Sequence, residues 1–418
     1  MQTQFIRIIL RIAIEREIIT SERFMNIPYH PSRLEINVDQ LKKNIGIIRK
    51  YLKNTLYCFP VKANAYGHGM DIVSKAAEES NVDFLAVACL REGIALREFG
   101  IKIPIIVFGA FHEHQIESFI DHDLQFTISS LLKAQWVLEK CNAMQKKCSI
   151  HLEVDTGIQR TGVRPSTAMT LLDFINSQSC FNLVGIYSHF ATADSPNDPF
   201  AYEQIQEFNK LSSHPIFKNK NIIWHLANSG GTAYYPESHF NMVRPSLLTF
   251  GYLPDSNVIP KGLEELAPCL TLKSQVSYFK VVEAGKGISY GHTYVTKKQS
   301  RIVTVPVGYG DGYPRALSNI AEVLIRGKRY PIAGTICMDQ FMVDIGDDEV
   351  FVGEEVVLIG KQGKEYISAV ELATLCNTNP REIFCSLNNR LERKVTMQLC
   401  EALVCDDLSH THQANTSY

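Results

Sequence analysis

Short apolar runs alternate with segments of helical spacing along residues 56–248, and this alternation constrains the fold more than any other feature. The runs are bounded by Gly, Asp or Asn and are rich in Val and Ile, which is typical of buried parallel strands. They cover residues 56–61, 84–88, 103–108, 125–128, 149–154, 183–187, 221–226 and 242–248. Helical spacing marks 70–80, 130–143 and 200–212 between them. These strand–helix units predict an α/β fold with an N-terminal (β/α)8 TIM-type barrel rather than an open doubly wound sheet, since no GxGxxG opens a helix.

Beyond about residue 268 the pattern changes to short β-rich runs that Gly and Pro interrupt. These runs, 272–282, 301–307, 322–325, 341–344 and 355–359, predict a C-terminal, mainly antiparallel β-domain. We therefore expect the barrel at 26–268, the β-domain at 269–405, and a disordered polar tail at 406–418. Residues 1–25 are apolar but interrupted by charges, and we interpret them as an amphipathic extension or a misplaced start before Met25, not as a signal peptide or a membrane span.

Composition narrows the class of protein. The chain has 418 residues and a formal net charge of -2, which favours neither nucleic acid nor an anionic membrane as a partner. Its 11 cysteines are odd in number and form no CxxC pair, so we expect reduced thiols in a cytoplasmic enzyme and no metal site.

One lysine stands at the end of the first apolar run. Lys62 follows Val61 and precedes a Gly-containing turn that ends at Gly69. A lysine at a strand mouth has hydrocarbon on one side and a ligand on the other, and desolvation favours its neutral amine, which can form a Schiff base. On spacing alone, a structural lysine that caps a strand end remains an alternative.

Further reactive side chains follow other strands of the predicted barrel. Arg160 comes after the run that ends at Val154, and His189 after the run that ends at Tyr187. The stretches 228–231 and 244–246 add an Asn-Ser-Gly-Gly loop and Arg-Pro-Ser. Because the βα loops of a barrel meet on one face, we expect these groups to converge there. Individually, Arg160 could be a solvated loop charge and His189 a hydrogen-bonded core residue.

These segments resemble those of one enzyme family. Residues 62–69, Lys-Ala-Asn-Ala-Tyr-Gly-His-Gly, closely resemble the pyridoxal 5'-phosphate (PLP) lysine segment of bacterial alanine racemases, which are PLP-dependent enzymes of fold type III. The stretches 155–162, 188–194, 228–229 and 241–244 are similar to the family's other barrel motifs, in the same order. In the second domain, 289–294, 306–312 and 336–340 match as well. The resemblance covers residues 33 to about 400.

The resemblance implies a role for each matching residue. Lys62 and Tyr290 are the two catalytic acid–base groups on opposite faces of the substrate, Lys62 for the D-isomer and Tyr290 for the L-isomer. Arg160 contacts both the cofactor and the substrate carboxylate, His189 lies beside the pyridine ring, and Arg244 faces the pyridine nitrogen. The groups implied for the cofactor phosphate are Tyr66, Asn228, Ser229, Ser246 and Leu247.

The resemblance also implies a homodimer with composite active sites, because the second-domain tyrosine reaches the partner subunit in this family. Tyr309 and Met338 would line the substrate entrance and carboxylate pocket, although large apolar residues in a β-domain are otherwise usually core.

The chain departs from the family pattern at two positions. Glu153 stands where many members carry a carbamylated lysine, and it is either a carboxylate that orients Arg160 or a solvated strand-edge glutamate. Asn389 stands where a tyrosine usually faces the phosphate and the substrate side chain, which opens space for a serine-sized substrate.

The resemblance therefore implies interconversion of L- and D-alanine, which supplies D-alanine for peptidoglycan. A broad-specificity, serine-accepting racemase remains an alternative on the same scaffold. A PLP-dependent decarboxylase is disfavoured because Arg244, not a carboxylate, faces the pyridine nitrogen. A non-catalytic PLP-homeostasis protein would lack the second domain and Tyr290.

Overall fold

The computed structural model describes residues 30–217, 221–255 and 257–396. The described chain forms two compact units. The barrel unit consists of residues 35–270 with 393–396, and the β unit consists of residues 30–34 with 271–392. The expected N-terminal extension at 1–25 and the expected tail at 406–418 lie outside the described residues.

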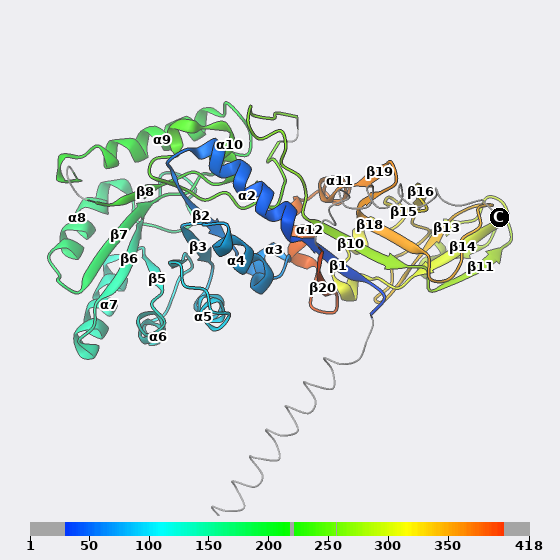
Figure 1. The fold of residues 1–418 in the computed structure, drawn as a ribbon, viewed down its shortest axis with the longest axis horizontal. Helices are drawn as coiled ribbons and strands as arrows, with labels where there is room; N and C mark the ends of the chain where they lie inside the picture. The colour runs from blue at the N-terminus through cyan, green and yellow to red at the C-terminus, as the bar shows by residue number, and fades with distance from the viewer. Residues whose placement is uncertain (1–29, 218–220, 256, 397–418) are drawn as a thin grey trace, which may run out of the picture. The chain divides into compact units, whose positions relative to one another are not determined.

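The barrel unit contains the eight parallel strands that the sequence predicts. They are β2 (Leu56–Pro60), β3 (Phe84–Val87), β4 (Ile105–Val107), β5 (Gln125–Ile128), β6 (Cys148–Glu153), β7 (Phe181–Tyr187), β8 (Ile223–His225) and β9 (Met242–Val243). Their spatial order is β8-β7-β6-β5-β4-β3-β2-β9. Backbone hydrogen bonds from Asn241 to Trp224 and from Arg244 to Ala227 connect β9 to β8, so the sheet closes on itself. The prediction of a barrel is confirmed (Figure 1).

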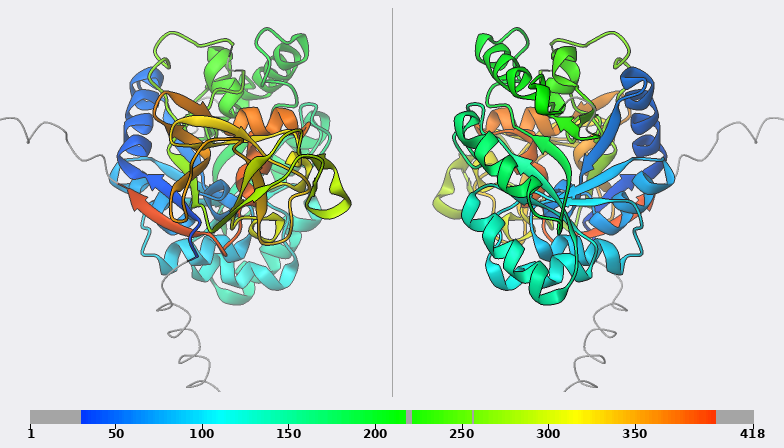
Figure 2. Two further views of the ribbon diagram at one scale, coloured as in Figure 1. Left: turned by 90° about the vertical axis from the view of Figure 1, so that its right-hand side faces the viewer. Right: turned by 90° about the vertical axis from the view of Figure 1, so that its left-hand side faces the viewer.

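Helices surround the strands of this unit (Figure 2, right). They are α2 (Val38–Leu52), α3 (Lys62–Tyr66), α4 (Met70–Glu79), α5 (Leu90–Glu98), α6 (Ile116–Asp121), α7 (Leu131–Met144), α8 (Pro165–Asn176), α9 (Pro199–Ser212) and α10 (Ser229–Tyr234). The short segment α3 lies at a strand end, where Lys62 and Tyr66 face a cavity. Local sequence sets the starts of the helices. The Ser130 hydroxyl accepts the N–H of Lys133 in α7, and the Asp198 carboxylate accepts those of Phe200 and Ala201 in α9.

Every residue of β3 and β4 is buried, which is why these strands appear in the sequence as unbroken apolar runs. Cys58, Ala86, Ile106 and Met242 form one of the buried clusters that join neighbouring strands. This packing leaves the strand ends, and the loops that follow them, in fixed positions.

The β unit is mainly antiparallel and carries two short helices. Its elements are β11 (Tyr278–Val282), β12 (Gly287–Ile288), β13 (Tyr294–Val295), β14 (Ser300–Val305), β15 (Glu322–Ile325), β16 (Lys328–Pro331), β17 (Phe341–Asp344), β18 (Glu355–Gln362), β19 (Glu365–Ile367), α11 (Ala369–Leu375) and α12 (Pro380–Ser386). The unit boundaries fall within β1 (Arg33–Asn37), β10 (Leu270–Gln275) and β20 (Glu392–Thr396). One sheet has the order β16-β15-β18-β10-β1-β20 with β19 on β18, and a second has the order β11-β14-β17.

Two details differ from the sequence-based expectation. The predicted run 272–282 is not one strand, because the chain changes partner at Val276 and Ser277. The Val276 N–H donates to Glu354, next to β18, whereas the Ser277 N–H donates to Thr304 in β14. The segment therefore serves two sheets, which an apolar pattern alone does not reveal. In addition, the sequence did not predict the strands β1, β12, β13, β16, β19 and β20 or the helices α11 and α12.

No helix in the described ranges is long and apolar enough to cross a bilayer.

Two glycines with nearly equal backbone angles allow steric crowding to be separated from backbone strain. Gly100 and Gly251 have φ of +89° and +90°. An added Cβ at Gly251 would lie 1.9 Å from the Ala267 carbonyl oxygen, whereas at Gly100 nothing lies within 4 Å. We expect Gly100→Ala to cost about 1 kcal/mol, the usual penalty of the left-handed region. Gly251→Ala should cost clearly more because the obstacle is backbone. Equal thermal midpoints for the two variants would contradict this packing.

Candidate active site

A cavity of about 310 Å³ opens at the carboxyl ends of the barrel strands and lies entirely within the barrel unit. Its walls bring together most of the predicted barrel-site residues, namely Lys62, Tyr66, Arg160, His189, Asn228, Arg244 and Ser246. Phe108 and Tyr187 add aromatic surface, and Glu153 adds a carboxylate. A cavity of this size with convergent polar groups on an apolar wall is typical of a small-molecule site.

The turn after Lys62 has a left-handed helical conformation, which the sequence does not predict. Residues Ala63 to Tyr66 have φ between +51° and +54°, and Gly67 follows at +77°. For residues other than Gly this conformation costs roughly 1–2 kcal/mol each, and such strain clusters at functional sites. The turn is held by backbone hydrogen bonds from Gly67 to Ala63 and from Gly69 to Asn64, at 3.0 Å each.

Glu92 anchors this turn to the neighbouring strand. Its carboxylate accepts the N–H of Ala63 at 2.6 Å, of Ala88 at 2.8 Å and of Cys89 at 3.3 Å. Ala88 and Cys89 directly follow β3, so one side chain joins the end of β3 to the residue after Lys62. The sequence analysis missed Glu92. Its position three residues after Cys89, at the start of a helix, is the signature of a capping box and could have indicated it.

Arg244 is 4% exposed and joins the ends of three strands. Its guanidinium donates to the Ser188 carbonyl at 2.8 Å and to the Leu226 carbonyl at 3.1 Å. It also donates to Nδ1 of His189 at 3.2 Å and to Nδ1 of His225 at 2.9 Å. The charge lies 5.4 Å from the centre of the Tyr187 ring, within cation–π range. Burial lowers the Arg244 pKa, and these acceptors compensate for the lost hydration.

Arg244 sets the proton positions of a buried chain of histidines. Because a guanidinium can only donate, Nδ1 of His225 must accept, so the neutral ring carries its proton on Nε2. Nε2 of His225 lies 3.1 Å from Nδ1 of His151, and Nε2 of His151 lies 2.8 Å from Oε1 of Gln125. Burial, reinforced by Arg244, lowers the pKa of His151 to about 3 and that of His225 well below its usual value. The same reasoning leaves the proton of a neutral His189 on Nε2.

Sequence reasoning missed the roles of Gln125, His151 and His225. A signal was present, since each is a polar residue within an apolar strand run. Gly185 is a second signal, because an added Cβ there would lie 2.6 Å from Nδ1 of His151. A glycine inside a strand often marks such a close approach.

Glu153 is buried at the end of β6, so the interpretation as a solvated strand-edge residue is wrong. Its Oε2 has no hydrogen-bond partner among the described residues. Burial raises the Glu153 pKa, and a hydrogen bond with Tyr187 and the charge of Arg160 oppose this shift. The carboxylate therefore lies in the cavity wall under the influence of Arg160.

Ser229 connects the groups that the sequence implies for phosphate binding. Its hydroxyl oxygen accepts the N–H of Ser246 at 3.0 Å and of Leu247 at 2.9 Å. The Asn228 side chain accepts the N–H of Gly231 at 2.9 Å and so starts α10. Asn228 and Ser246 line the cavity, whereas Ser229 and Leu247 are buried behind it.

The predicted site residues of the β unit lie on its surface. Tyr290 is 72% exposed, Met338 53% and Tyr309 43%, so these side chains are not core. Asn389 is exposed as well. Hydrogen bonds connect their segments: the Thr335 hydroxyl donates to the Tyr290 carbonyl, and the Gly310 N–H donates to the Met338 carbonyl.

The two units match two family models in sequence order. Residues 36–254 match "Alanine racemase, N-terminal domain", and residues 269–395 match "Alanine racemase, C-terminal domain".

Curated relatives and solved structures agree with this match. The chain is 39% identical over 365 residues to the alanine racemase of Symbiobacterium thermophilum, covering 87% of this chain and 96% of that one. It is 38% identical over 369 residues to the alanine racemase of Methanococcus maripaludis, with 87% and 98% covered. Among solved structures, the alanine racemase of Clostridium difficile superposes with a TM-score of 0.83 at 35% identity, covering 89% of this chain and 97% of that one. The enzyme of Streptomyces lavendulae gives 0.84 at 30% identity, with 89% and 98% covered.

Together with these matches, a parallel barrel followed by an antiparallel β unit, with a lysine and two arginines in the barrel cavity, places the chain among the PLP-dependent enzymes of the barrel type. The chain belongs to the alanine racemase family. Its enzymatic class is therefore that of an isomerase, and its cofactor is PLP.

The cavity residues fit this cofactor. Lys62 supplies an amine for an aldehyde carbon, and Phe108 and Tyr187 supply aromatic surface for a ring. Arg160 and Arg244 supply positive charge for an anionic ligand. The buried Glu153 carboxylate balances part of that charge.

Histidine burial near the Lys62 turn predicts a dependence of stability on pH. His68 stacks on Phe250 with 4.0 Å between ring centres, and burial lowers the His68 pKa to about 4. Because the unfolded chain takes up a proton near pH 6.5 and the folded chain does not, stability is lost as the pH falls from about 6.5 towards 4.

We expect His68→Gln to reduce this loss by about 1.4 kcal/mol per pH unit, the slope of one proton. Urea unfolding of both proteins between pH 7.5 and 5 measures it. The variant should also be less stable at pH 7.5, since it loses the ring contact. Parallel pH curves for the two proteins would refute the assignment.

Proposed function

We propose that this enzyme interconverts L- and D-alanine by proton transfer at the substrate Cα between Lys62 and Tyr290 of the partner subunit. The reaction would take place in the cytoplasm and would supply D-alanine for peptidoglycan. The observation that supports this most is the cavity in which Lys62 lies together with Arg160, His189 and Arg244. Membership of the alanine racemase family agrees with it.

Several barrel side chains are suited to bind the cofactor. When bound, PLP delocalises the negative charge that remains on Cα after the proton leaves. Arg160 would bind the substrate carboxylate and an oxygen of the ring, and His189 would lie beside the ring. The phosphate would be bound by the side chains of Tyr66, Asn228 and Ser246, which line the cavity. Ser229 would act from behind by fixing the backbone of Ser246 and Leu247 through its hydroxyl.

Arg244 would control how strongly the ring withdraws electrons. A guanidinium does not readily release a proton, so Arg244 would donate a hydrogen bond to the pyridine nitrogen without protonating it. The four acceptors around Arg244 fix its position. A weaker electron sink favours return of the proton to Cα over side reactions such as transamination.

Two acid–base groups on opposite faces are required to invert a stereocentre. Lys62 would serve the D-isomer from the barrel side, and Tyr290 of the partner subunit would serve the L-isomer. The Arg244–His189 hydrogen bond presents positive charge toward the site, which stabilises a phenolate. In this proposal, positive charge acts on the Tyr290 phenolate through a chain of contacts from Arg244 to His189 to Tyr290.

We infer that the enzyme acts as a homodimer with two composite sites. Tyr290, Tyr309 and Met338 are exposed on the β unit and their segments are joined by hydrogen bonds, as expected for side chains that enter another subunit's site. In this proposal the barrel unit binds PLP, and the β unit contributes the catalytic tyrosine.

The two-base proposal predicts isomer-specific effects. Tyr290→Phe should reduce racemisation at least about 100-fold, the usual contribution of a general base. In D2O, exchange of the Cα hydrogen of L-alanine should stop, whereas exchange from D-alanine should persist through Lys62. Proton NMR of each isomer measures the exchange, and the cofactor absorbance of the variant should be retained.

Tyr278→Phe is the matched control, because Tyr278 is an exposed tyrosine of the same unit. It should racemise alanine like the wild type. Turnover in Tyr290→Phe equal to that of this control would remove Tyr290 from the mechanism.

A second candidate substrate is serine. Asn389 lies between Asn388, whose amide donates to the Gly310 carbonyl at 2.8 Å, and Arg390, whose guanidinium donates to Asp339 at 2.9 Å. Asn389 is thereby held in the same loop cluster as Tyr309 and Met338. A carboxamide there is smaller than the phenol of the family pattern and can hydrogen-bond a hydroxyl on the substrate Cβ.

We therefore expect measurable kcat/KM for L-serine, and expect Asn389→Tyr to lower the serine-to-alanine ratio of kcat/KM by about tenfold or more. Chiral chromatography of both products measures the ratio, with alanine as the internal control. Negligible serine turnover by the wild type would eliminate this second substrate.

A further inference from the structure

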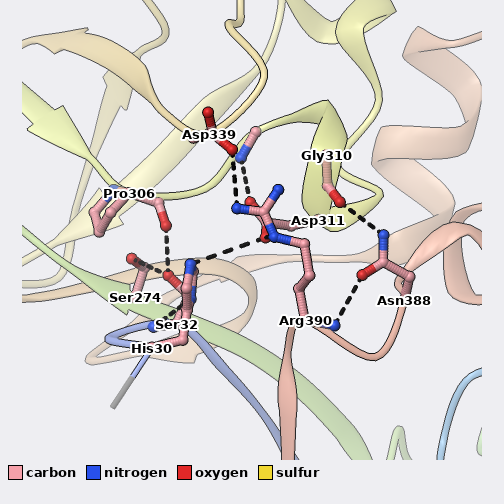
Figure 3. A network of polar contacts seen from close by, with 10 residues as sticks. His30, Ser32, Ser274, Pro306, Gly310, Asp311, Asp339, Asn388 and Arg390 are labelled. Carbon is pink, nitrogen blue, oxygen red and sulfur yellow. Dashed lines mark hydrogen bonds and ion pairs between the residues drawn. The ribbon is translucent and has the colours of Figure 1, made fainter. Parts of the chain in front are cut away.

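Arg390 lies where three loops of the β unit meet (Figure 3). One loop contains the short 3-10 turn η5 (Tyr309–Asp311), the second contains Met338 and Asp339, and the third is residues 388–390. Tyr309, Met338 and Asn389 are proposed substrate-side residues, one in each loop.

The charge at the centre of the network is the Asp311 carboxylate, which is completely buried. Its Oδ2 accepts the Gly308 N–H at 2.8 Å. Its Oδ1 forms an ion pair with Nε of Arg390 at 3.2 Å, outside hydrogen-bond geometry, and His30 Nε2 lies 3.9 Å away. A buried carboxylate is tolerated only when it is paired, so Asp311 holds the Arg390 side chain in place.

Arg390 extends from Asp311 to the second loop. Its Nη2 donates to Oδ1 of Asp339 at 2.9 Å, so one guanidinium joins a buried and an exposed carboxylate (Figure 3). Backbone hydrogen bonds strengthen the same junction: Tyr309 donates to Cys337 at 3.2 Å and Gly310 donates to Met338 at 2.8 Å. The third loop is attached by Asn388, whose N–H donates to the Asp311 carbonyl at 3.1 Å.

Gly310 shows how closely the guanidinium is packed. A Cβ at this position would lie 2.4 Å from Nη1 of Arg390 and 2.9 Å from the Met338 carbonyl oxygen. Only a glycine leaves the guanidinium in its place between the loops. Lysine could not replace Arg390. The planar guanidinium presents N–H groups in two directions and so reaches both carboxylates, whereas a single ammonium group does not.

We propose that Arg390 is a positioning residue that sets alanine affinity by fixing the loops of Tyr309, Met338 and Asn389. This inference rests on the proposed function, which assigns those three side chains to the substrate. Arg390 itself contacts no reacting atom. Its loss should weaken substrate binding more than it slows proton transfer, because Lys62 and Tyr290 are not among its contacts.

The test compares Arg390→Lys with Arg326→Lys as the matched control. Arg326 forms an exposed ion pair with Glu354 in the same unit. Arg390→Lys should raise the KM for L-alanine by about tenfold, the effect of one charge-assisted hydrogen bond, while kcat changes less than about threefold. Arg326→Lys should leave both constants unchanged, and the cofactor absorbance should be the same in all three proteins.

A second readout does not depend on activity. Cys337 lies beside Met338 and is half-buried, whereas Cys89 of the barrel unit is exposed. Alkylation by iodoacetamide, followed by mass spectrometry, should modify Cys337 several-fold faster in Arg390→Lys, relative to Cys89 in the same sample. If the wild type proves inactive on alanine, the proposed function fails and the effect on alanine affinity fails with it, whereas the Cys337 rate still decides whether Arg390 fixes these loops.

Asp339→Ala provides an independent variant that removes the acceptor of the Arg390 Nη2 and leaves the guanidinium itself in the protein. It should reproduce the higher KM and the faster Cys337 alkylation, and it decides the matter if Arg390→Lys does not fold. Wild-type KM and wild-type Cys337 rates in the folded variants would overturn the proposal. So would a fall in kcat at constant KM, because that pattern indicates a general structural defect.

Discussion

The barrel site depends on one buried charge, the guanidinium of Arg244. Transferring such a group out of water is costly unless acceptors replace the lost hydration. Here the carbonyls of Ser188 and Leu226 and the rings of His189 and His225 perform that function. These acceptors follow or end β7 and β8, and Arg244 itself follows β9. The same contacts that stabilise the charge therefore fix three strand ends around the cavity.

The β unit also contains a buried charge that needs a partner, and here the charge is an anion. Asp311 is inaccessible to water, and Arg390 is the cation that pairs with it and continues to Asp339. In each unit a buried charge fixes side chains of the proposed site: Arg244 fixes His189, and Asp311 with Arg390 fixes the loops of Tyr309 and Met338. This arrangement allows exposed residues such as Tyr309 and Met338 to hold a defined geometry without being packed into a core.

Much of this molecule could be predicted from local sequence, and the remainder could not. Buried parallel strands are apolar at every position, so all eight barrel strands could be recognised, and Lys62 and Arg244 could be located at their ends. The break in the run 272–282 could not be predicted, because Val276 and Ser277 form backbone hydrogen bonds with segments that are distant in the sequence. The left-handed turn after Lys62 was also missed, since Asn64 tolerates this conformation as a single residue but the Ala and Tyr residues around it disfavour it. The second-unit residues Tyr290 and Asn389 were found only through family resemblance.

The chain from Arg244 through His225 and His151 to Gln125 has a fixed donor order. Each imidazole already donates one hydrogen bond and accepts another. A proton that left the cavity through the barrel interior would have to pass along His225 and His151. Each ring would then have to become an imidazolium or change its tautomer, and burial strongly disfavours the imidazolium form. The histidines of the barrel interior thus oppose proton transfer out of the cavity on that side. Exchange of the Cα hydrogen with solvent would therefore occur through the open end of the barrel and not through its interior.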